Sequence, residues 1–264
     1  EMCIRDRLAT LCLRNVTPAR LLAPRMQAAR SVTLFSATLS PRHFYSDLLG
    51  MPADTAWLEV AAPFRAEQLE VRIASQVSTR YQQRHASLAP IVELIAQQYE
   101  RMPGNYLAFF SSFEYLQQVA GLLAERHGQI PLWAQEPGMD EAARQGFLDR
   151  FVADGKGVGF AVLGGAFGEG VDLPGTRLIG AFVATLGLPQ VNPVNEQFKQ
   201  RLGQQFGAGF DYAYLYPGVR KVIQAAGRVI RGDQDRGVLV LIDERFAEPR
   251  VQQMFPTWWP AAIL

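Results

Sequence analysis

The chain has little cysteine, little net charge and no long apolar run, and each shortage excludes a class of protein. Cys3 and Cys12 are too few to build a disulfide framework, a four-thiolate zinc site or an iron–sulfur cluster by themselves. A net charge of +1 gives no overall basic field, so any contact with nucleic acid must come from a local patch. The longest apolar runs are too short to span a membrane, and no signal peptide is recognisable. We therefore expect a cytoplasmic protein without a membrane partner.

Several catalytic motifs are also missing. The chain has no G-x-x-x-x-G-K-[ST] loop and no D-E-x-H or D-E-x-D box, so it lacks the parts that hold the β- and γ-phosphates and a metal. It has no G-x-S-x-G elbow, and its histidines are far apart, which argues against nucleophilic hydrolysis. The first residue is Glu1 and not Met, so we expect a fragment or a processed piece, and residues 1–7 are left out of the fold prediction.

Short apolar runs alternate with amphipathic stretches along most of the chain. The predicted strands are Ser31–Phe35, Leu69–Ala74, Asn105–Phe110, Ile130–Trp133, Phe160–Leu163, Leu178–Val183 and Val238–Ile242. The predicted helices run from Pro41 or Arg42 to Leu49, and over Arg84–Arg101, Phe113–His127 and Met139–Ala153, with one more beginning near Lys221. This order predicts an α/β fold with a mostly parallel sheet and helices on both faces. Residues 186–220 form a long insertion, which either borders a nucleic-acid track or is an ordinary surface excursion.

Polar clusters follow three of the predicted strands, at residues 36–40, 111–112 and 164–172. Ligands of open parallel sheets gather at the carboxyl ends of strands, so these clusters are candidate binding residues. Residues 164–175 contain five glycines within twelve positions, and the backbone N–H groups of such a loop can point at an anion. Glu169 and Asp172 in this loop suit a ribose hydroxyl, a water or an ion, although a plain turn is the simpler interpretation.

The stretch from Lys221 to Arg245 reads as an amphipathic helix, a charged turn and a buried strand. At about 100° per residue, Gln224, Gly227, Arg228 and Arg231 fall on one face of that helix. Arginine suits bidentate contact with phosphate oxygens, and Gly227 leaves room for a close approach to the backbone. The alternative is an ordinary solvated helix face.

Taken together, the clusters resemble the ordered motifs of superfamily 2 helicases. The matching segments are Ser36-Ala37-Thr38 (motif III), residues 109–112 (motif IV), residues 168–172 (motif V) and residues 224–231 (motif VI). Their order and spacing resemble the XPD/Rad3-like branch, and most closely the bacterial DinG/YoaA-like helicases. The resemblance covers about residues 8 to 250. Gly168 departs from the pattern, since many relatives have Trp or Ser there.

The resemblance implies two RecA-like motor domains, with ATP and Mg²⁺ in the cleft between them. The first motor domain would hold most of the nucleotide and carry an iron–sulfur insertion. Residues 1–41 would then be a tail plus the last strand of that first domain, and residues 42–264 the second motor domain. Because the strand Ser31–Phe35 would be separated from its own sheet, we expect it to be misplaced, frayed or packed opportunistically. The implied function is an ATP-dependent 5′-to-3′ DNA helicase, which couples hydrolysis to translocation on single-stranded DNA and unwinds duplexes in repair or replication.

The resemblance also assigns roles to single residues, with no metal ligand among them. The implied catalytic residues are Arg228 and Arg231, as arginine fingers, and Gln224, as a γ-phosphate sensor. The implied nucleotide-binding residues are Gly168, Glu169, Gly170, Asp172 and Gly227. The implied contacts to the single strand are Ser36, Thr38, Ser111, Ser112 and Thr185. Two alternatives remain open: a non-catalytic RecA-like module that binds nucleic acid or protein, and a different nucleotide enzyme, such as a transferase, that uses the glycine-rich loop.

Overall fold

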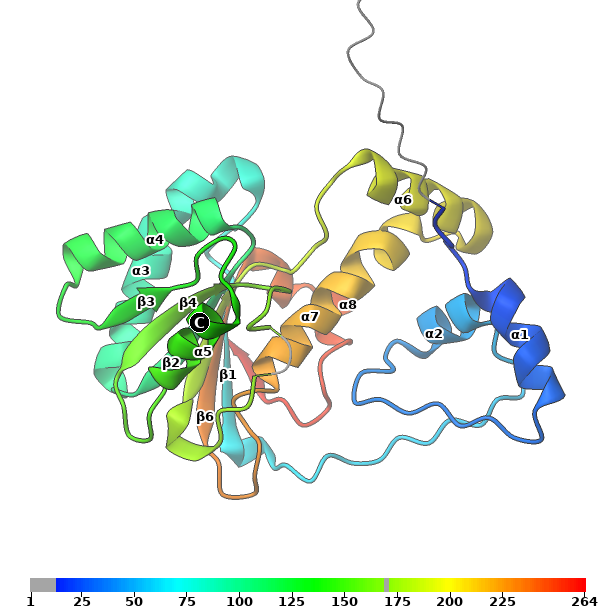
Figure 1. The fold of residues 1–264 in the computed structure, drawn as a ribbon, viewed down its shortest axis with the longest axis horizontal. Helices are drawn as coiled ribbons and strands as arrows, with labels where there is room; N and C mark the ends of the chain where they lie inside the picture. The colour runs from blue at the N-terminus through cyan, green and yellow to red at the C-terminus, as the bar shows by residue number, and fades with distance from the viewer. Residues whose placement is uncertain (1–12, 169–170) are drawn as a thin grey trace, which may run out of the picture.

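The computed structural model of the chain describes residues 13–168 and 171–264. Within them, one seven-stranded sheet has the strand order β3-β4-β2-β5-β6-β1-β7, and every paired neighbour is parallel (Figure 1). The predicted α/β fold is therefore confirmed. Cys3, Cys12, Glu169 and Gly170 lie outside the described residues.

The elements occupy most of the predicted segments. The strands are β1 (Leu69–Ala74), β2 (Asn105–Phe110), β3 (Leu132–Ala134), β4 (Gly157–Val162), β5 (Gly180–Ala184), β6 (Gly237–Ile242) and β7 (Ala261–Ile263). The α-helices are α1 (Ala19–Ala28), α2 (Arg42–Leu49), α3 (Arg84–Arg101), α4 (Phe113–Arg126), α5 (Glu141–Asp149), α6 (Pro193–Phe206), α7 (Tyr216–Ala226) and α8 (Pro249–Gln252). Among the described helices, none has the length and apolar character that a membrane crossing requires.

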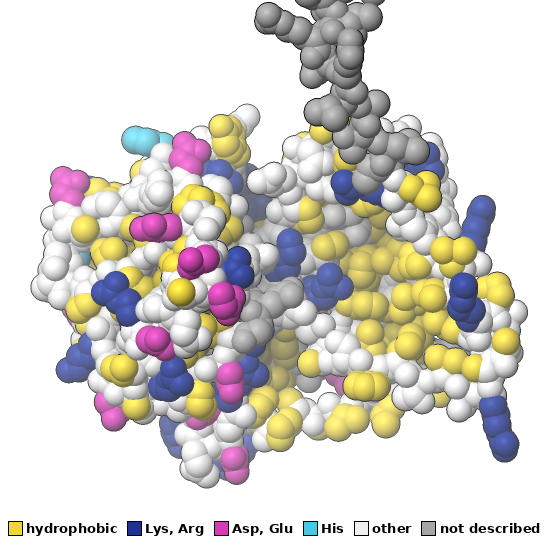
Figure 2. All heavy atoms as spheres, in the orientation of Figure 1, with side chains coloured by type: hydrophobic (Ala, Val, Ile, Leu, Met, Phe, Trp, Pro, Cys, Tyr) yellow, Lys and Arg dark blue, Asp and Glu magenta, His cyan; other side chains and the backbone are white. Residues whose placement is uncertain are grey.

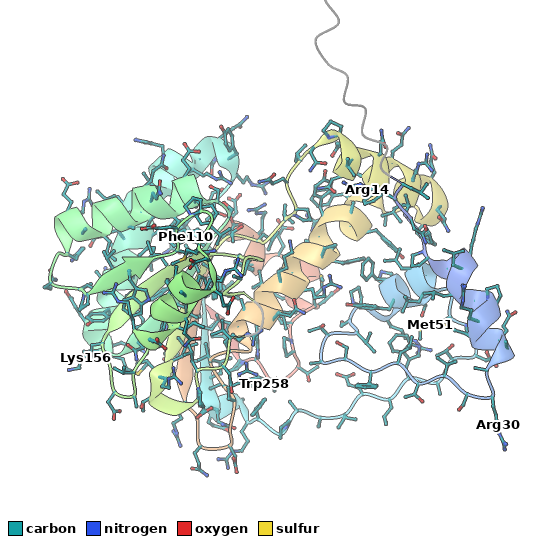
Figure 3. The ribbon with its side chains drawn as sticks, viewed as in Figure 1. Arg14, Arg30, Met51, Phe110, Lys156 and Trp258 are labelled. Carbon is teal, nitrogen blue, oxygen red and sulfur yellow. The ribbon has the colours of Figure 1, made fainter. Side chains whose placement is uncertain are left out.

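Helices cover both faces of the sheet, as predicted. Residues from α3 and α4 pack in one core, and residues from α5, α7 and α8 pack in the other. Phe110, labelled in Figure 3, belongs to the first core, where its ring lies 5.4 Å from that of Phe160 and 5.7 Å from that of Tyr115. All six residues of β2 and of β6 are buried, because a parallel sheet that is covered on both faces needs apolar side chains at successive positions.

The predicted insertion at residues 186–220 contains a helix that the sequence reading missed. Asn192 caps α6, since its Oδ1 accepts from the Asn195 N–H at 2.9 Å, and Pro193 stands in the first turn. Gly207 ends the helix at a φ of 77°, a conformation that glycine adopts readily. A π-helical turn, Asp211–Leu215, then leads directly into α7. Two signals were therefore present, an Asn-Pro start and a Gly stop.

The N-terminal part of the described chain lies beside α6 and α7 (Figure 1). Phe44 of α2, Leu202 of α6 and Tyr212 of the π-helical turn form a third, smaller core. In Figure 2, apolar side chains gather over this part of the molecule, and the exposed ones include Leu58 and Val60, at 88% and 78%. The N-terminal part is thus joined to the helices, and it contributes no strand to the sheet.

The segment Ser31–Phe35 is not a buried strand in this structure, in agreement with the expectation that, separated from its own sheet, it would be misplaced or frayed. Those residues form neither helix nor strand, and Phe35 is 90% exposed. A strand requires a neighbour for its backbone hydrogen bonds, and the segment pairs with none in the described sheet. Smaller differences occur elsewhere: β3 begins two residues later than predicted, α5 is shorter at both ends, and the edge strand β7 was not predicted.

Candidate functional site

The two candidate arginine fingers lie in the loop after α7, and not on its face as predicted. The helix ends at Ala226, and turn bonds follow, from Gly227 N–H to the Ile223 carbonyl at 2.9 Å and from Arg228 N–H to the Ala225 carbonyl at 3.2 Å. Gly227 is the C-cap, and glycine has a helix propensity about 1 kcal/mol below that of alanine. Val229 and Ile230, beyond this end of the helix, are both buried in the core.

Both guanidinium groups meet the glycine-rich loop at one backbone carbonyl. The Val171 oxygen accepts from Arg228 Nη1 at 2.8 Å and from Arg231 Nη2 at 3.0 Å. Arg228 Nη2 also points at the Gly168 carbonyl, at 3.5 Å, and Arg231 Nε lies 3.4 Å from a carboxylate oxygen of Asp172. Two segments that are far apart in the sequence thus form one cationic site. Glu169 and Gly170 of the same loop lie outside the described residues.

Gln224 and Gly227 complete the arginine side of the site. Gln224 is half-buried on the last turn of α7, and Gly227 is exposed directly after it. Lys221, which the sequence reading did not single out, lies against the start of the glycine-rich loop. A Cβ atom on Gly164 would lie 3.2 Å from its Cδ and 3.3 Å from its Nζ. The signal was its spacing, since a residue three positions before Gln224 shares a helix face with it.

The donor chemistry of this site suits a phosphate chain. Guanidinium groups bind phosphate oxygens in pairs, and two of them converge here from one loop. Among residues 13–168 and 171–264, no group of three or more His, Cys, Asp or Glu side chains is placed to hold a metal ion. The residues present therefore fit the anionic end of a nucleotide.

A second polar cluster occupies the carboxyl ends of the strands. Ser112 caps α4, because its Oγ accepts from the Tyr115 N–H at 3.3 Å. Ser111 Oγ accepts from Arg84 Nη2 at 2.8 Å. The Arg84 guanidinium lies 5.2 Å from the ring centres of both Tyr81 and Tyr115, so the two tyrosines hold it in place. Sequence reasoning missed Arg84, whose only signal was a cation at the start of a predicted helix.

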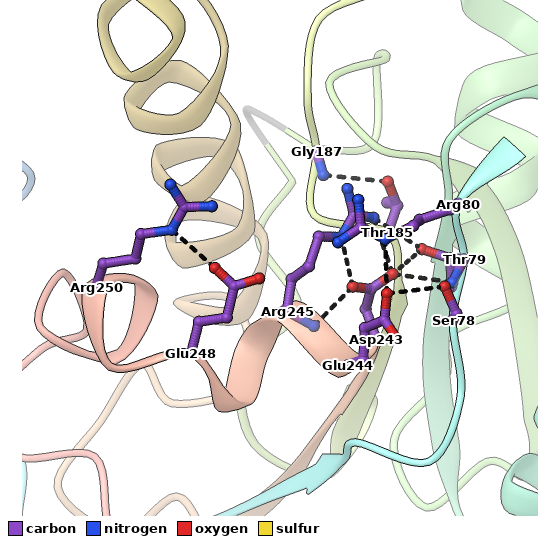
Figure 4. Close-up of polar contacts among 10 residues, drawn as sticks. All are labelled: Ser78, Thr79, Arg80, Thr185, Gly187, Asp243, Glu244, Arg245, Glu248 and Arg250. Carbon is purple, nitrogen blue, oxygen red and sulfur yellow. Dashed lines mark hydrogen bonds and ion pairs between the residues drawn. The ribbon is translucent and has the colours of Figure 1, made fainter. Parts of the chain in front are cut away.

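Thr185 reaches the same edge of the sheet from β5, but it is buried. Its Oγ accepts from the Gly187 N–H at 3.1 Å, and only 6% of the residue is exposed. Gly187 has a φ of 72°, and a Cβ there would come within 2.6 Å of the Gly218 carbonyl. The hydroxyl of Thr185 therefore shapes the loop that leaves β5 (Figure 4).

Asp243, at the end of β6, is the centre of the hydrogen-bond network in Figure 4. It is fully buried and accepts from Arg245 Nε at 2.6 Å, from Arg245 Nη2 at 2.8 Å and from the Thr79 N–H at 2.9 Å. Burial alone would raise the pKa of Asp243, but the hydrogen bonds and charge of Arg245, with the bonds from Thr79, hold it below the ordinary value. The network ties the residues after β1 to those after β6.

Ser36 and Thr38 lie apart from the strand-end cluster. They contact each other, with the Thr38 N–H 3.2 Å from Ser36 Oγ, and the Tyr45 hydroxyl of α2 donates to the Thr38 carbonyl at 2.6 Å. Within the described part of the chain, no hydrogen bond joins them to Ser111, Ser112 or Thr185. The structure thus separates the predicted nucleic-acid contacts into two groups.

Comparison with known proteins decides the family. Residues 95–262 match the family described as the helicase C-terminal domain. The chain belongs to this family. Over 262 residues, this helicase C-terminal domain is 26% identical to the ATP-dependent helicase DinG of Mycobacterium tuberculosis. The aligned region covers 95% of this chain and 38% of that relative. Over 165 residues, it is 31% identical to a probable ATP-dependent helicase of Methanocaldococcus jannaschii. This aligned region covers 56% of the chain and 25% of that relative.

The solved structures agree on the fold. An XPD helicase superposes with a TM-score of 0.73 at 18% identity, over 95% of this chain and 46% of that one. At this identity the likeness shows the RecA-like fold alone. The helicase C-terminal domain described here spans less than two fifths of the length of both curated relatives, at 38% and 25%.

Proposed function

We propose that residues 42–264 are the second motor domain of a DinG-like, ATP-dependent DNA helicase. Residues 1–41 then include the last strand of the first motor domain of the same polypeptide. That first domain holds most of the ATP and its Mg²⁺, while this chain supplies Arg228 and Arg231 from across the cleft. The observation that carries the proposal is the convergence of both guanidiniums on the Val171 carbonyl, beside the glycine-rich loop.

The arginines act by electrostatic stabilisation. In the transition state of ATP hydrolysis, negative charge is spread over the three equatorial oxygens of the γ-phosphoryl group. Arg228 and Arg231 place positive charge beside those oxygens, and such a contribution is worth about 10³–10⁵ in kcat. Gln224 offers an amide to the same group from the last turn of α7. The nucleotide is bordered by Gly168, Glu169, Gly170, Asp172 and Gly227. Of these, Glu169 and Asp172 couple the state of the nucleotide to the bound DNA.

The nucleic-acid partner in this proposal is single-stranded DNA. Ser111, Ser112 and the loop around Thr185, together with Ser36 and Thr38, contact the sugar–phosphate backbone. Arg84 adds a cation at the strand ends, held by Ser111 and two tyrosines, and this side chain supports a phosphate contact most directly. The resemblance to DinG-like helicases further suggests 5′-to-3′ polarity, a role in DNA repair or replication, a cytoplasmic location and an iron–sulfur cluster on the first domain.

The test compares Arg228→Ala with Arg236→Ala in the full-length helicase. Arg236 serves as the control because it is an exposed arginine in the same loop. We expect Arg228→Ala to abolish DNA-stimulated ATP hydrolysis and leave affinity for single-stranded DNA largely intact, while Arg236→Ala retains activity. The isolated chain should hydrolyse little or no ATP. Full turnover by Arg228→Ala would refute the arginine-finger role and favour a module that takes no part in catalysis. Appreciable DNA-stimulated turnover by the isolated chain would refute the claim that a first motor domain must hold the ATP.

A further inference from the structure

A buried glutamine directly before β1 forms hydrogen bonds with the loop that carries Arg231. Gln68 is 4% exposed and ends the short 3₁₀ turn Ala66–Gln68, directly before β1. Its Nε2 lies 3.1 Å from the Gly232 carbonyl, 3.2 Å from that of Asp233 and 3.0 Å from that of Asp235. Its Oε1 accepts from the Arg65 N–H at 2.9 Å. One side chain thus joins two backbone segments that are more than 160 residues apart.

Asp235, which belongs to the same loop, forms hydrogen bonds with the loop backbone. One of its carboxylate oxygens accepts from the Arg231 N–H and from the Gly232 N–H, both at 2.7 Å. The backbone of Arg231 is therefore held by a charged acceptor, and charge-assisted bonds are about twice as strong as neutral ones. On the apolar side, Val229 and Ile230 anchor the loop in the core. The base of the Arg231 side chain is thereby fixed from two directions.

The sheet register explains why Gln68 reaches this loop. β1 and β6 are parallel neighbours, and Leu69 is paired with Gly237. The residue before β1 therefore lies beside the residues before β6, which are those of the arginine loop. Because the sheet sets this adjacency, the Gln68 amide has a fixed position relative to Arg231. No motif in the sequence links the two.

We propose that Gln68 is a positioning residue for Arg231 and that it acts together with Asp235. The inference rests on the proposed role of Arg231 as an arginine finger. Arg231 must meet a phosphate held mainly by another domain, so the reach of its flexible side chain depends on where its backbone is anchored. A catalytic group that is misplaced by about 1 Å can lose about 100-fold in rate. Gln68 itself lies under the loop and contacts only backbone groups there.

The experiment compares Gln68→Met with Gln98→Met in the intact helicase. Gln98 is a matched control because it is also buried, at 3%, and its amide is also hydrogen-bonded, to Arg72 and Tyr106, but it lies on α3. We expect Gln68→Met to lower the kcat of DNA-stimulated ATP hydrolysis about 10- to 100-fold, with KM for ATP and affinity for single-stranded DNA nearly unchanged. Gln98→Met should keep kcat within about twofold of the unmodified protein, even if its melting temperature falls by as much as that of Gln68→Met.

A double variant separates positioning from simple destabilisation. If Gln68 acts through Arg231, adding Gln68→Met to Arg231→Ala should cost no further activity, because interacting residues are not additive. Hydrogen exchange should show faster exchange of the Arg231 and Gly232 amides in Gln68→Met alone. Where Gln68→Met does not fold, Asp235→Ala removes the carboxylate at the loop itself and should lower kcat in the same way.

The outcomes also separate this inference from the proposed function. Normal kcat in a folded Gln68→Met or Asp235→Ala protein, or full additivity with Arg231→Ala, would overturn the positioning role while leaving the arginine finger intact. If Arg231→Ala itself kept full activity, the proposed function of the loop would be overturned first. Loss of kcat in Gln98→Met equal to that in Gln68→Met would show a general structural effect, and it would overturn the inference too.

Discussion

Two arginine–carboxylate pairs near the end of the chain differ strongly in burial. Arg245 Nε lies 2.6 Å from Asp243 Oδ1, and Arg250 Nε lies 2.7 Å from Glu248 Oε2 (Figure 4). In each pair the arginine follows the carboxylate by two residues. The side chains of the first pair are 12% and 0% exposed, and those of the second are 57% and 33% exposed. Neutralising each carboxylate therefore compares a buried ion pair, whose Asp243 also accepts from Thr79, with an exposed one.

The expected costs follow from solvation. Asp243→Asn leaves the Arg245 guanidinium buried without its counter-charge, and breaking a buried pair in this way costs about 3–5 kcal/mol. Glu248→Gln leaves Arg250 in contact with water, so that change should cost about 0–1 kcal/mol. With about 2–4 °C of melting temperature per kcal/mol in a domain near this size, we expect a fall of about 6–20 °C for Asp243→Asn and less than about 4 °C for Glu248→Gln.

The measurement is thermal unfolding of the chain, followed by circular dichroism, with urea unfolding as a second determination of the free energy. The unmodified chain and both variants are compared at the same neutral pH and salt concentration. Equal shifts for the two variants would refute the reasoning, because burial would then make no difference. A fall of less than about 2 °C for Asp243→Asn would refute it as well, since that fall is below the cost of a buried unpaired charge.

Two further predictions concern acid stability and DNA. The pKa of Asp243 lies below the ordinary value of 3.8, so its contribution is present above that pH and is lost as the pH falls through the lower folded-state pKa. Acid titration of the unfolding free energy should therefore show a shallower decline in Asp243→Asn, and parallel curves would contradict this. In the intact helicase, Arg84→Ala should weaken binding to single-stranded DNA and reduce the salt slope by about 0.7, measured by fluorescence anisotropy. Arg101→Ala, at the other end of α3, should change neither, and an equal effect of both would rule out a specific contact.

Local patterns predicted the fold well where one segment settles its own conformation. The helix Arg84–Arg101 and the strands Leu69–Ala74 and Asn105–Phe110 have the predicted bounds, because periodicity and turn residues mark both ends. The helical path predicted through Arg231 is wrong, because the helix ends at Gly227, whose helix propensity is about 1 kcal/mol below that of alanine. Val229 and Ile230 are buried in the core beyond that end.

The segment at residues 31–35 pairs with no strand of the described sheet, as expected for a strand that is separated from its own sheet. Its composition is typical of a buried strand, but a strand forms only where another strand offers backbone partners, and none in the described sheet does. That it completes the sheet of a first motor domain remains a prediction. Thr185 gives a milder case, since it reaches the predicted edge of the sheet but its hydroxyl accepts from Gly187 inside the loop.

The sequence by itself determined the α/β class, the order of the motifs and the residue types at the candidate site, because these depend on local periodicity and on side-chain chemistry. Only the tertiary structure decided which groups meet. It brought Arg228 and Arg231 onto the Val171 carbonyl, and it placed Gln68 beneath the same loop. The physical reason is that parallel pairing of β1 with β6 sets residues far apart in the chain side by side, and no local signal encodes that contact.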